Sequence, residues 1–294
     1  MNDLRTYLES HYSPISITSY EDKINKYLIY IGSDGMNSNQ LEILDYIGHL
    51  RKCNLHPRTI YNHLYSIKIY YNYLQQSGQR EDHPCKTLKL KDQINRSIQI
   101  ESLYTAEQME QFLAEHKTKQ VFLQRRDEAI IGLLIYQALT NTEVVDLLTE
   151  HVNLEEGKVH ISNKNKGAKN TNKSRTLSLQ PKQILLIDRY LNLDRPGLEQ
   201  RSANTYPNLL LTKYGKPIQP GAINRQINHG YQKFMKMSPL KIRQSVIHHK
   251  LREGHNVRVV QAFAGHRSIL STEAYQTNHI EELRKGINKY HPLG

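Results

Sequence analysis

The sequence predicts a mainly α protein with a small β-hairpin or sheet, arranged as a helical domain followed by a mixed α/β domain. Apolar residues recur at helical spacing through most of the chain, and only residues 158–162 and 175–179 alternate as strands do. Residues 83–103 contain a proline and several lysines but show no helical period. We therefore expect a first domain at 1–82, a basic linker at 83–103 and a second domain at 104–294.

The composition points to a polyanionic partner. The 294 residues include 40 Lys and Arg against 28 Asp and Glu, a formal net charge of +12 with a pI near 9.5. A chain this basic has DNA or RNA as its first candidate partner, although a basic protein can also lack such a role. Two cysteines, Cys53 and Cys85, build no disulfide framework. We find no apolar signal core and no membrane-length apolar run, so we expect a cytoplasmic protein.

Three helices are predicted in the first domain. Thr18 and Glu21 form a candidate capping box for a helix that ends at Ile31, a second helix covers residues 41–50, and Pro57 opens a third that Gly78 closes. The exposed positions of this bundle are polar or basic and include Arg58 and Lys68. Such a face can lie against a phosphate backbone, but a merely solvated polar face explains the same residues equally well.

The second domain alternates helices with one hairpin. Thr105 and Gln108 form a capping-box pair, and the two strands flank a basic tip at 163–174. The remaining predicted elements are a helix from Arg125, a short helix with Glu143, a helix from Pro181 to Leu193, a short strand at 209–212 and a helix from Ala222 to Met235.

The stretch from Arg243 to Tyr275 contains an arginine, a histidine and a tyrosine that could act together on a phosphate. Gly265 and His266 follow Arg243 by 22 and 23 residues, and Tyr275 follows His266 by nine. Helix-compatible apolar positions fill the intervals. A guanidinium can bind the non-bridging oxygens of a phosphate, an imidazole can donate to the same group, and a phenol can attack in line. These residues therefore predict phosphoryl transfer.

With these motifs, the sequence resembles the tyrosine recombinase (phage integrase) family over nearly its whole length. The specific segments are SPLKIRQ, LREG, VQAFAGHRS and AY at fixed intervals, and LLIYQALTNTEVVDLL followed by VNLEEGKVHIS adds moderate support. The resemblance implies a helical core-type DNA-binding domain, a basic linker and a catalytic domain. It also implies that the ending GINKYHPLG is a C-terminal tail that packs onto a neighbouring protomer.

The resemblance assigns catalytic roles to matching positions. Tyr275 matches the nucleophile that leaves a 3′-phosphotyrosyl link and a free 5′-hydroxyl, Arg243 matches the second arginine, and His266 matches a phosphate donor. The general acid of the family is a lysine in the hairpin turn, which matches Lys164, with Lys166 as a close rival. This chemistry uses no metal and no cofactor. Zinc binding by His248, His249, His255 and His266 is a further possibility, but their spacing matches no metal-ligand pattern.

Two family positions are substituted. Thr140 stands where the first arginine belongs, and Leu240 replaces the histidine three residues before Arg243. Losing one preorganised donor lowers a rate on the order of 10²–10³-fold, and losing an imidazole that assists proton transfer lowers it about 10²–10⁴-fold. Three cations are candidates to compensate: Lys241, Arg267 and Arg175.

Two functions follow from this pattern. The first is a site-specific DNA recombinase of the integrase or transposase type. The second is a catalytically impaired DNA-binding accessory or architectural subunit that acts with an active recombinase. Both imply double-stranded DNA as the partner and a nucleoid-associated location. The resemblance implies a DNA-induced homo-tetramer formed through the tail, and the accessory function adds a hetero-oligomer as the alternative. The linker and hairpin lysines are the expected phosphate contacts: Lys86, Lys89, Lys91, Lys169 and Lys173.

Overall fold

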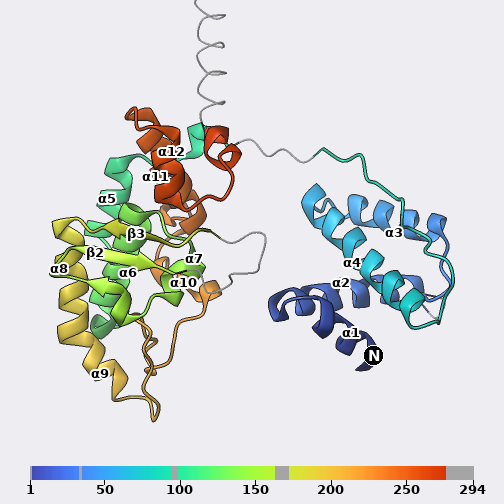
Figure 1. Cartoon of the computed structure of the whole chain (residues 1–294), viewed down its shortest axis with the longest axis horizontal. Helices are drawn as coiled ribbons and strands as arrows, with labels where there is room; N and C mark the ends of the chain where they lie inside the picture. Colours follow the sequence, from blue (N-terminus) through green and yellow to red (C-terminus); the bar gives the residue numbers. More distant parts are fainter. Residues whose placement is uncertain (1, 33–34, 94–97, 163–171, 276–294) are drawn as a thin grey trace, which may run out of the picture. The chain divides into compact units, whose positions relative to one another are not determined.

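The computed structural model confirms the predicted fold class, since the protein is mostly helical with one three-stranded sheet (Figure 1). The structure describes residues 2–32, 35–93, 98–162 and 172–275. The chain divides into two units, Met1–Arg96 and Ser97–Gly294. Among the described residues, no helix has both the length and the apolar composition that membrane crossing requires.

The described N-terminal unit consists of helices α1 (Asn2–His11), α2 (Pro14–Ile31), α3 (Gln40–Lys52) and α4 (Pro57–Gln76). The predicted start of α2 at Thr18 is wrong, because Pro14 occupies the first turn and begins the helix earlier. Helix α3 begins at a capping box in which the Asn39 side chain accepts from the Glu42 backbone and the Glu42 carboxylate accepts from the Asn39 backbone.

Tyrosines fill much of the core of this unit. The hydroxyls of Tyr27 in α2 and Tyr71 in α4 are hydrogen-bonded at 2.7 Å, and both side chains are fully buried. The Tyr71 hydroxyl also donates to the Gly35 carbonyl. Buried phenols need such partners, because an unpaired hydroxyl in the core is unfavourable.

Residues 85–92, in the segment expected to be a linker, pack onto this bundle. Cys85 and Leu90 are buried in its core. The Lys68 ammonium donates to the carbonyls of Lys86 and Leu88 at 3.0 and 2.8 Å. The side chain of Lys68 therefore holds the chain that follows the bundle. The side chains of Lys86, Lys89 and Lys91 are exposed.

The C-terminal unit surrounds helix α6 (Gln124–Gln137), which packs against α8, α10 and α11 (Figure 1). The sheet has the antiparallel order β1-β2-β3, with Val159 opposite Leu177. Side chains at alternate positions of β2 are buried, as the sequence pattern predicted. The other elements are α5 (Ala106–Ala114), α7 (Asn141–Asp146), β1 (Val152–Asn153), β2 (Lys158–Ile161), β3 (Arg175–Ser178), α8 (Pro181–Arg189), α9 (Arg195–Glu199), α10 (Pro220–Ile227), α11 (Pro239–Arg252) and α12 (Val257–Ala264).

Two predicted helix ends differ from the structure. The helix expected to reach Met235 ends at Ile227, and Gly230 then adopts a φ of 83° that a continuing helix does not allow. The helix expected to stop at Leu193 continues through a π-helical turn into α9. The capping box of Thr105 and Gln108 is present as predicted.

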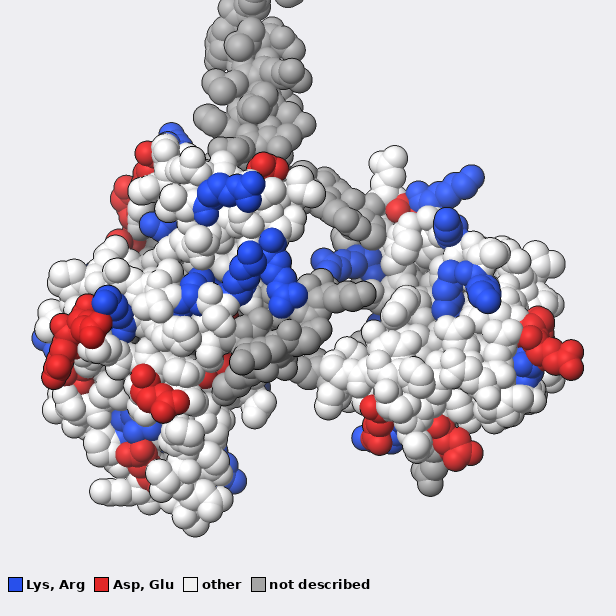
Figure 2. Space-filling model, viewed as in Figure 1, with Lys and Arg blue, Asp and Glu red and all other residues white. Residues whose placement is uncertain are grey.

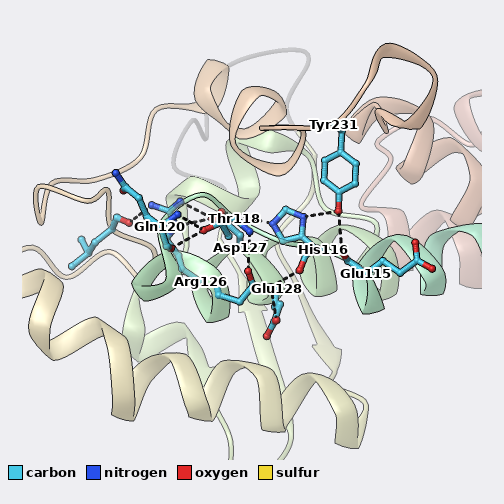
Figure 3. A network of polar contacts seen from close by, with 10 residues as sticks. Glu115, His116, Thr118, Gln120, Arg126, Asp127, Glu128 and Tyr231 are labelled. Atoms are coloured by element: carbon cyan, nitrogen blue, oxygen red, sulfur yellow. Dashed lines mark hydrogen bonds and ion pairs between the residues drawn. The ribbon is translucent and has the colours of Figure 1, made fainter.

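A buried polar network fixes the start of α6 (Figure 3). Arg126 and Asp127 form an ion pair at 2.6 Å with both side chains almost wholly buried. Arg126 also donates to the Leu211 carbonyl at 3.1 Å, and Asp127 lies 3.8 Å from the ring of His116. The network thus joins α6 to the loop at residue 211 and to the segment after α5.

Candidate active site

Five parts of the chain bring the candidate catalytic side chains into one cluster. Arg243 comes from the first turns of α11, His266 follows α12, and Tyr275 lies in the helical residues 270–275. Tyr275 packs against Ile247 and other apolar side chains of α11 and α12. Glu143 on α7 and Arg175 on β3 complete the cluster from more distant parts of the chain.

Arg243 is held by backbone carbonyls. Its Nη1 donates to the Ala138 carbonyl and its Nη2 donates to the Ala264 carbonyl at 2.6 Å. Ala138 ends α6 in the left-handed conformation, with φ of 50°, which is unusual for a residue with a Cβ. Burial lowers the pKa of the Arg243 guanidinium, although the nearby Glu143 carboxylate opposes this. A guanidinium nevertheless stays charged at neutral pH.

Thr140 has a capping role in the structure. Its hydroxyl donates to the Glu143 carboxylate at 3.0 Å and accepts from the Glu143 backbone at 3.3 Å, so the pair forms the capping box of α7. Both hydrogen-bonding functions of the hydroxyl therefore serve the helix start. The threonine expected at the position of the family's first arginine is thus engaged in local structure.

Glu143 connects two guanidinium groups. Its Oε1 accepts from Arg175 Nη1 at 2.6 Å, and its Oε2 lies 3.8 Å from Arg243 Nη1. Burial alone would raise the pKa of Glu143, but the hydrogen bond and charge of Arg175 bring it below the ordinary value. The carboxylate is therefore ionised at neutral pH and compensates part of the positive charge.

Arg175 reaches the cluster from β3. Its Nε donates to the Phe263 carbonyl at 2.7 Å, and its side chain is 7% exposed. Its Nη2 is buried and has no hydrogen-bond partner among the described residues. Of the three cations expected to compensate for Thr140 and Leu240, Arg175 is the one that contacts Glu143 and lies within the electrostatic reach of His266.

The absence of a side chain at Gly265 allows Arg175 to lie close to the backbone after α12. A Cβ at this position would lie 2.5 Å from Arg175 Nη1 and 3.1 Å from the Lys173 carbonyl. Gly265 also has a φ of 72°, where L side chains are strained. Its carbonyl accepts from the Lys173 backbone at 2.8 Å. The Gly-His motif is thus joined to the hairpin strand that carries Arg175.

His266 is oriented by Thr272. Its Nδ1 lies 2.9 Å from the Thr272 hydroxyl, which is fully buried. Burial is the largest cause that lowers the pKa of the imidazole, and the charges of Arg243 and Arg175 add to it, so the pKa falls from 6.5 to about 4. The ring is therefore neutral at pH 7. When Thr272 donates to Nδ1, the ring carries its proton on Nε2, where it is a hydrogen-bond donor.

This low pKa predicts a pH-dependent stability. Between pH 6.5 and about 4, the unfolded chain binds a proton at residue 266 that the folded protein does not. Stability should therefore fall as pH falls through this range. His266→Gln should make the loss of stability shallower in urea titrations from pH 7.5 to 4.5. The exposed His229→Gln is the matched control, and identical slopes for wild type and His266→Gln would contradict the prediction.

Tyr275 is buried, with 7% of its surface exposed. Burial raises the pKa of its phenol above the ordinary value, and the charge of Arg243 opposes this rise in part. The phenol is therefore protonated at neutral pH in the protein alone. Attack by its oxygen requires that the proton leave as the bond to phosphorus forms.

The other predicted site residues lie apart from this cluster or outside the described residues. Lys164, Lys166 and Lys169 are outside them. Lys241 places its ammonium 4.9 Å from the Tyr104 ring centre, on the helix face away from Arg243, since residues two apart do not share a helix face. Leu240 is 66% exposed. The side chains of Arg267, Lys173 and Arg58 are exposed.

Sequence reasoning missed the roles of Glu143, Thr272 and Asn172. Asn172 donates to Glu143 Oε1 at 3.0 Å. Thr272 precedes Tyr275 by three residues, a helical neighbour spacing that could have suggested a shared face. The contacts of Glu143 with Arg175 and Asn172 join residues about 30 positions apart, and short-range patterns carry no signal for such a pair.

Basic side chains are exposed around the cluster. Figure 2 shows lysine and arginine atoms on the face of this unit that carries α12 and the end of β3, whereas aspartate and glutamate atoms gather near α8. Arg258 lies in α12, Arg267 follows that helix and Lys173 precedes β3, and all three side chains are exposed. A positive surface of this kind is suited to a polyanion.

The chain is similar to known proteins over nearly its whole length. Residues 103–282 match the family model described as the phage integrase family. The tyrosine recombinase XerD of Chlorobaculum tepidum is 26% identical over 300 residues, which cover 98% of this chain and 93% of the relative. The tyrosine recombinase XerC of Lacticaseibacillus casei is 24% identical over 298 residues, which cover 97% and 95%.

Solved structures share the fold. The XerH recombinase bound to difH substrate in a pre-cleavage complex has a TM-score of 0.70 at 16% identity, with coverage of 92% of this chain and 81% of that chain. The Tn1549 transposon integrase in complex with circular intermediate DNA has a TM-score of 0.63 at 17% identity, with coverage of 96% and 98%. With the match to the family model, these findings establish that the chain belongs to the phage integrase family of tyrosine recombinases.

Proposed function

We propose that this protein is a site-specific DNA recombinase that cuts and rejoins DNA through a 3′-phosphotyrosyl intermediate. The observation that supports this most strongly is that the buried Arg243 donates to the Ala264 carbonyl, close to the Gly-His pair, and that its charge acts on the pKa of both His266 and Tyr275. The similar XerH and Tn1549 proteins were solved in complex with DNA. The basic surface around the cluster agrees with double-stranded DNA as the substrate.

In the proposed reaction, the Tyr275 oxygen attacks the scissile phosphorus and the bond to the 5′-oxygen breaks. The phenol loses one proton and the leaving oxygen gains one, so the step balances without a cofactor. The Arg243 guanidinium binds non-bridging oxygens and the neutral His266 donates to the same phosphate. The lysine of the hairpin tip, Lys164 or Lys166, protonates the leaving oxygen. Attack by the free 5′-hydroxyl of another strand reverses these changes and releases Tyr275.

We propose further that four copies act together on two DNA duplexes. Each copy would contact a neighbouring copy through its C-terminal tail. Residues 276–294, which include this tail, lie outside the described residues. The exposed Lys86, Lys89 and Lys91 after the helical bundle are the contacts that we propose to the phosphate backbone.

The accessory function remains the second proposal, and two observations favour it. The Thr140 hydroxyl serves the α7 cap, and the apolar Leu240 is exposed where the family has a histidine. Both observations describe a site with fewer donors than the family pattern. Such a subunit would bind DNA and join a hetero-oligomer with an active recombinase.

Covalent trapping distinguishes the two functions. Nicked duplexes tiled across the DNA that flanks the gene should give a protein–DNA adduct with the wild type, seen as a band that resists denaturing electrophoresis. Tyr275→Phe should give no adduct but should bind the same DNA, because only the attacking oxygen is removed. Tyr214→Phe, at a tyrosine that is 62% exposed, is the matched control and should react as the wild type does. Tight binding without any wild-type adduct would favour the accessory function, and an adduct with Tyr275→Phe would assign another nucleophile.

A further inference from the structure

One nitrogen in the cluster is buried and unsatisfied. Arg175 uses Nε for the Phe263 carbonyl and Nη1 for Glu143, whereas its Nη2 has no partner among the described residues. A buried donor without a partner is unfavourable, and more so when it is charged. Native structures contain few such groups, and those that occur are often functional. In Arg243, in contrast, Nη1 and Nη2 each donate to a backbone carbonyl, so both terminal nitrogens have a partner.

The charges around Arg175 indicate what kind of ligand its Nη2 could bind. Arg175 and Arg243 approach different oxygens of the same carboxylate, Glu143. Two guanidinium groups and one carboxylate leave a net positive charge beside His266 and Tyr275. An anion is the ligand that such a site stabilises, and a phosphate has several oxygens that can accept from a planar guanidinium.

We propose that Arg175 supplies, through Nη2, the second guanidinium that binds the scissile phosphate, in the role that Thr140 leaves vacant. This inference rests on the proposed DNA-cleavage function. Arginine on β3 replaces arginine before α7, and Glu143 positions the new guanidinium by its ion pair. Gly265 is then required for two reasons, since its φ is positive and since a Cβ would collide with Arg175. Lys241 and Arg267 have no part in this arrangement.

A purely structural role of Arg175 and a phosphate-binding role predict different effects of its removal on the reaction rate. If Arg175 only joined β3 to α7 and α12, its loss would loosen the site and slow the reaction regardless of the charge on the substrate. If Arg175 binds a non-bridging oxygen, its loss matters most when that oxygen carries negative charge. A substrate with a methylphosphonate at the scissile position has one charged oxygen fewer and so separates the two roles.

The experiment compares adduct formation by wild type, Arg175→Ala and Arg175→Lys on nicked duplexes with a phosphate or a methylphosphonate at the scissile position. On phosphate we expect both variants to form adduct about 10²–10³-fold more slowly than wild type. On methylphosphonate we expect the deficit of Arg175→Ala to shrink at least about tenfold, since less charge must be neutralised. Arg189→Ala, at an exposed arginine of α8, is the charge-matched control and should behave as the wild type does.

Each outcome decides between the alternatives. A deficit of equal size on both substrates, or adduct formation by Arg175→Ala at the wild-type rate, overturns the proposal. If Arg175→Ala does not fold, Arg175→Lys carries the comparison, because lysine keeps the charge beside Glu143 but lacks the second donor arm. Absence of adduct with wild type on phosphate contradicts the cleavage function itself and is thereby distinguished from a failure of the Arg175 assignment.

Discussion

Replacing Glu143 by alanine is expected to lower the free energy of unfolding of the C-terminal unit by about 3–5 kcal/mol, because two buried guanidinium groups lose their shared counter-charge. The same change removes the capping box with Thr140. We expect adduct formation to slow by at least about 10²-fold, since Arg175 and Arg243 then repel each other and leave their positions. Urea unfolding followed by circular dichroism measures the first effect, and trapping on nicked DNA measures the second.

Glu156→Ala is the matched control for this prediction. Glu156 forms an exposed ion pair with Lys158 at 2.8 Å, and such a solvent-screened pair contributes little to stability. Equal stability losses for Glu143→Ala and Glu156→Ala would show that the contacts of Glu143 do not hold the site together. Glu143→Gln also removes the counter-charge but keeps an amide oxygen that can accept from Arg175, so it should lose stability too, although less than Glu143→Ala does.

The second large effect is expected at the start of α6, away from the catalytic cluster. Asp127→Ala leaves the buried Arg126 without its ion-pair partner, and removing one member of a buried pair costs about 3–5 kcal/mol. The contact with His116 is lost as well. We expect a lower urea midpoint for the C-terminal unit, while variants that remain folded should still form the covalent adduct.

Two further variants test the reason for this effect. The double substitution Arg126→Met with Asp127→Leu removes both charges, and buried pairs replaced by apolar residues are often as stable as the original. It should therefore recover much of the stability that Asp127→Ala loses. Asp22→Ala, which breaks an exposed pair with Lys26 at 2.8 Å, is the surface control and should change little. A double variant as unstable as Asp127→Ala would contradict the unpaired-charge explanation.

Much of the fold followed from local patterns. The helix that Pro57 opens, the capping box of Thr105 and the antiparallel strands around the hairpin are present as the sequence predicts. Each depends on residues within one or two turns of one another, so short-range propensity decides them. The wrong helix boundaries, at Pro14 and Ile227, lie where a second local signal competed with the first.

In the candidate site, too, local patterns account for some residues and not for others. The intervals between Arg243, His266 and Tyr275 are fixed by α11, α12 and the helix that follows, so the sequence by itself selected the residues that we propose as the nucleophile and its two partners. It also predicted that Thr140 and Leu240 stand at substituted family positions. The sequence could not choose among the candidate compensating cations. Lys241 is two residues from Arg243 and lies on another helix face, whereas Arg175 is 32 residues from Glu143 and contacts it.

Only the tertiary structure decided that Arg175 belongs to the cluster, that Glu143 holds it and that Thr140 caps α7. The physical reason is that an ion pair in a low-dielectric interior depends on distances of a few ångströms between elements, whereas spacing along the chain specifies only which residues share one element. Packing of β3 against α12 contributes to those distances, and no local pattern encodes it.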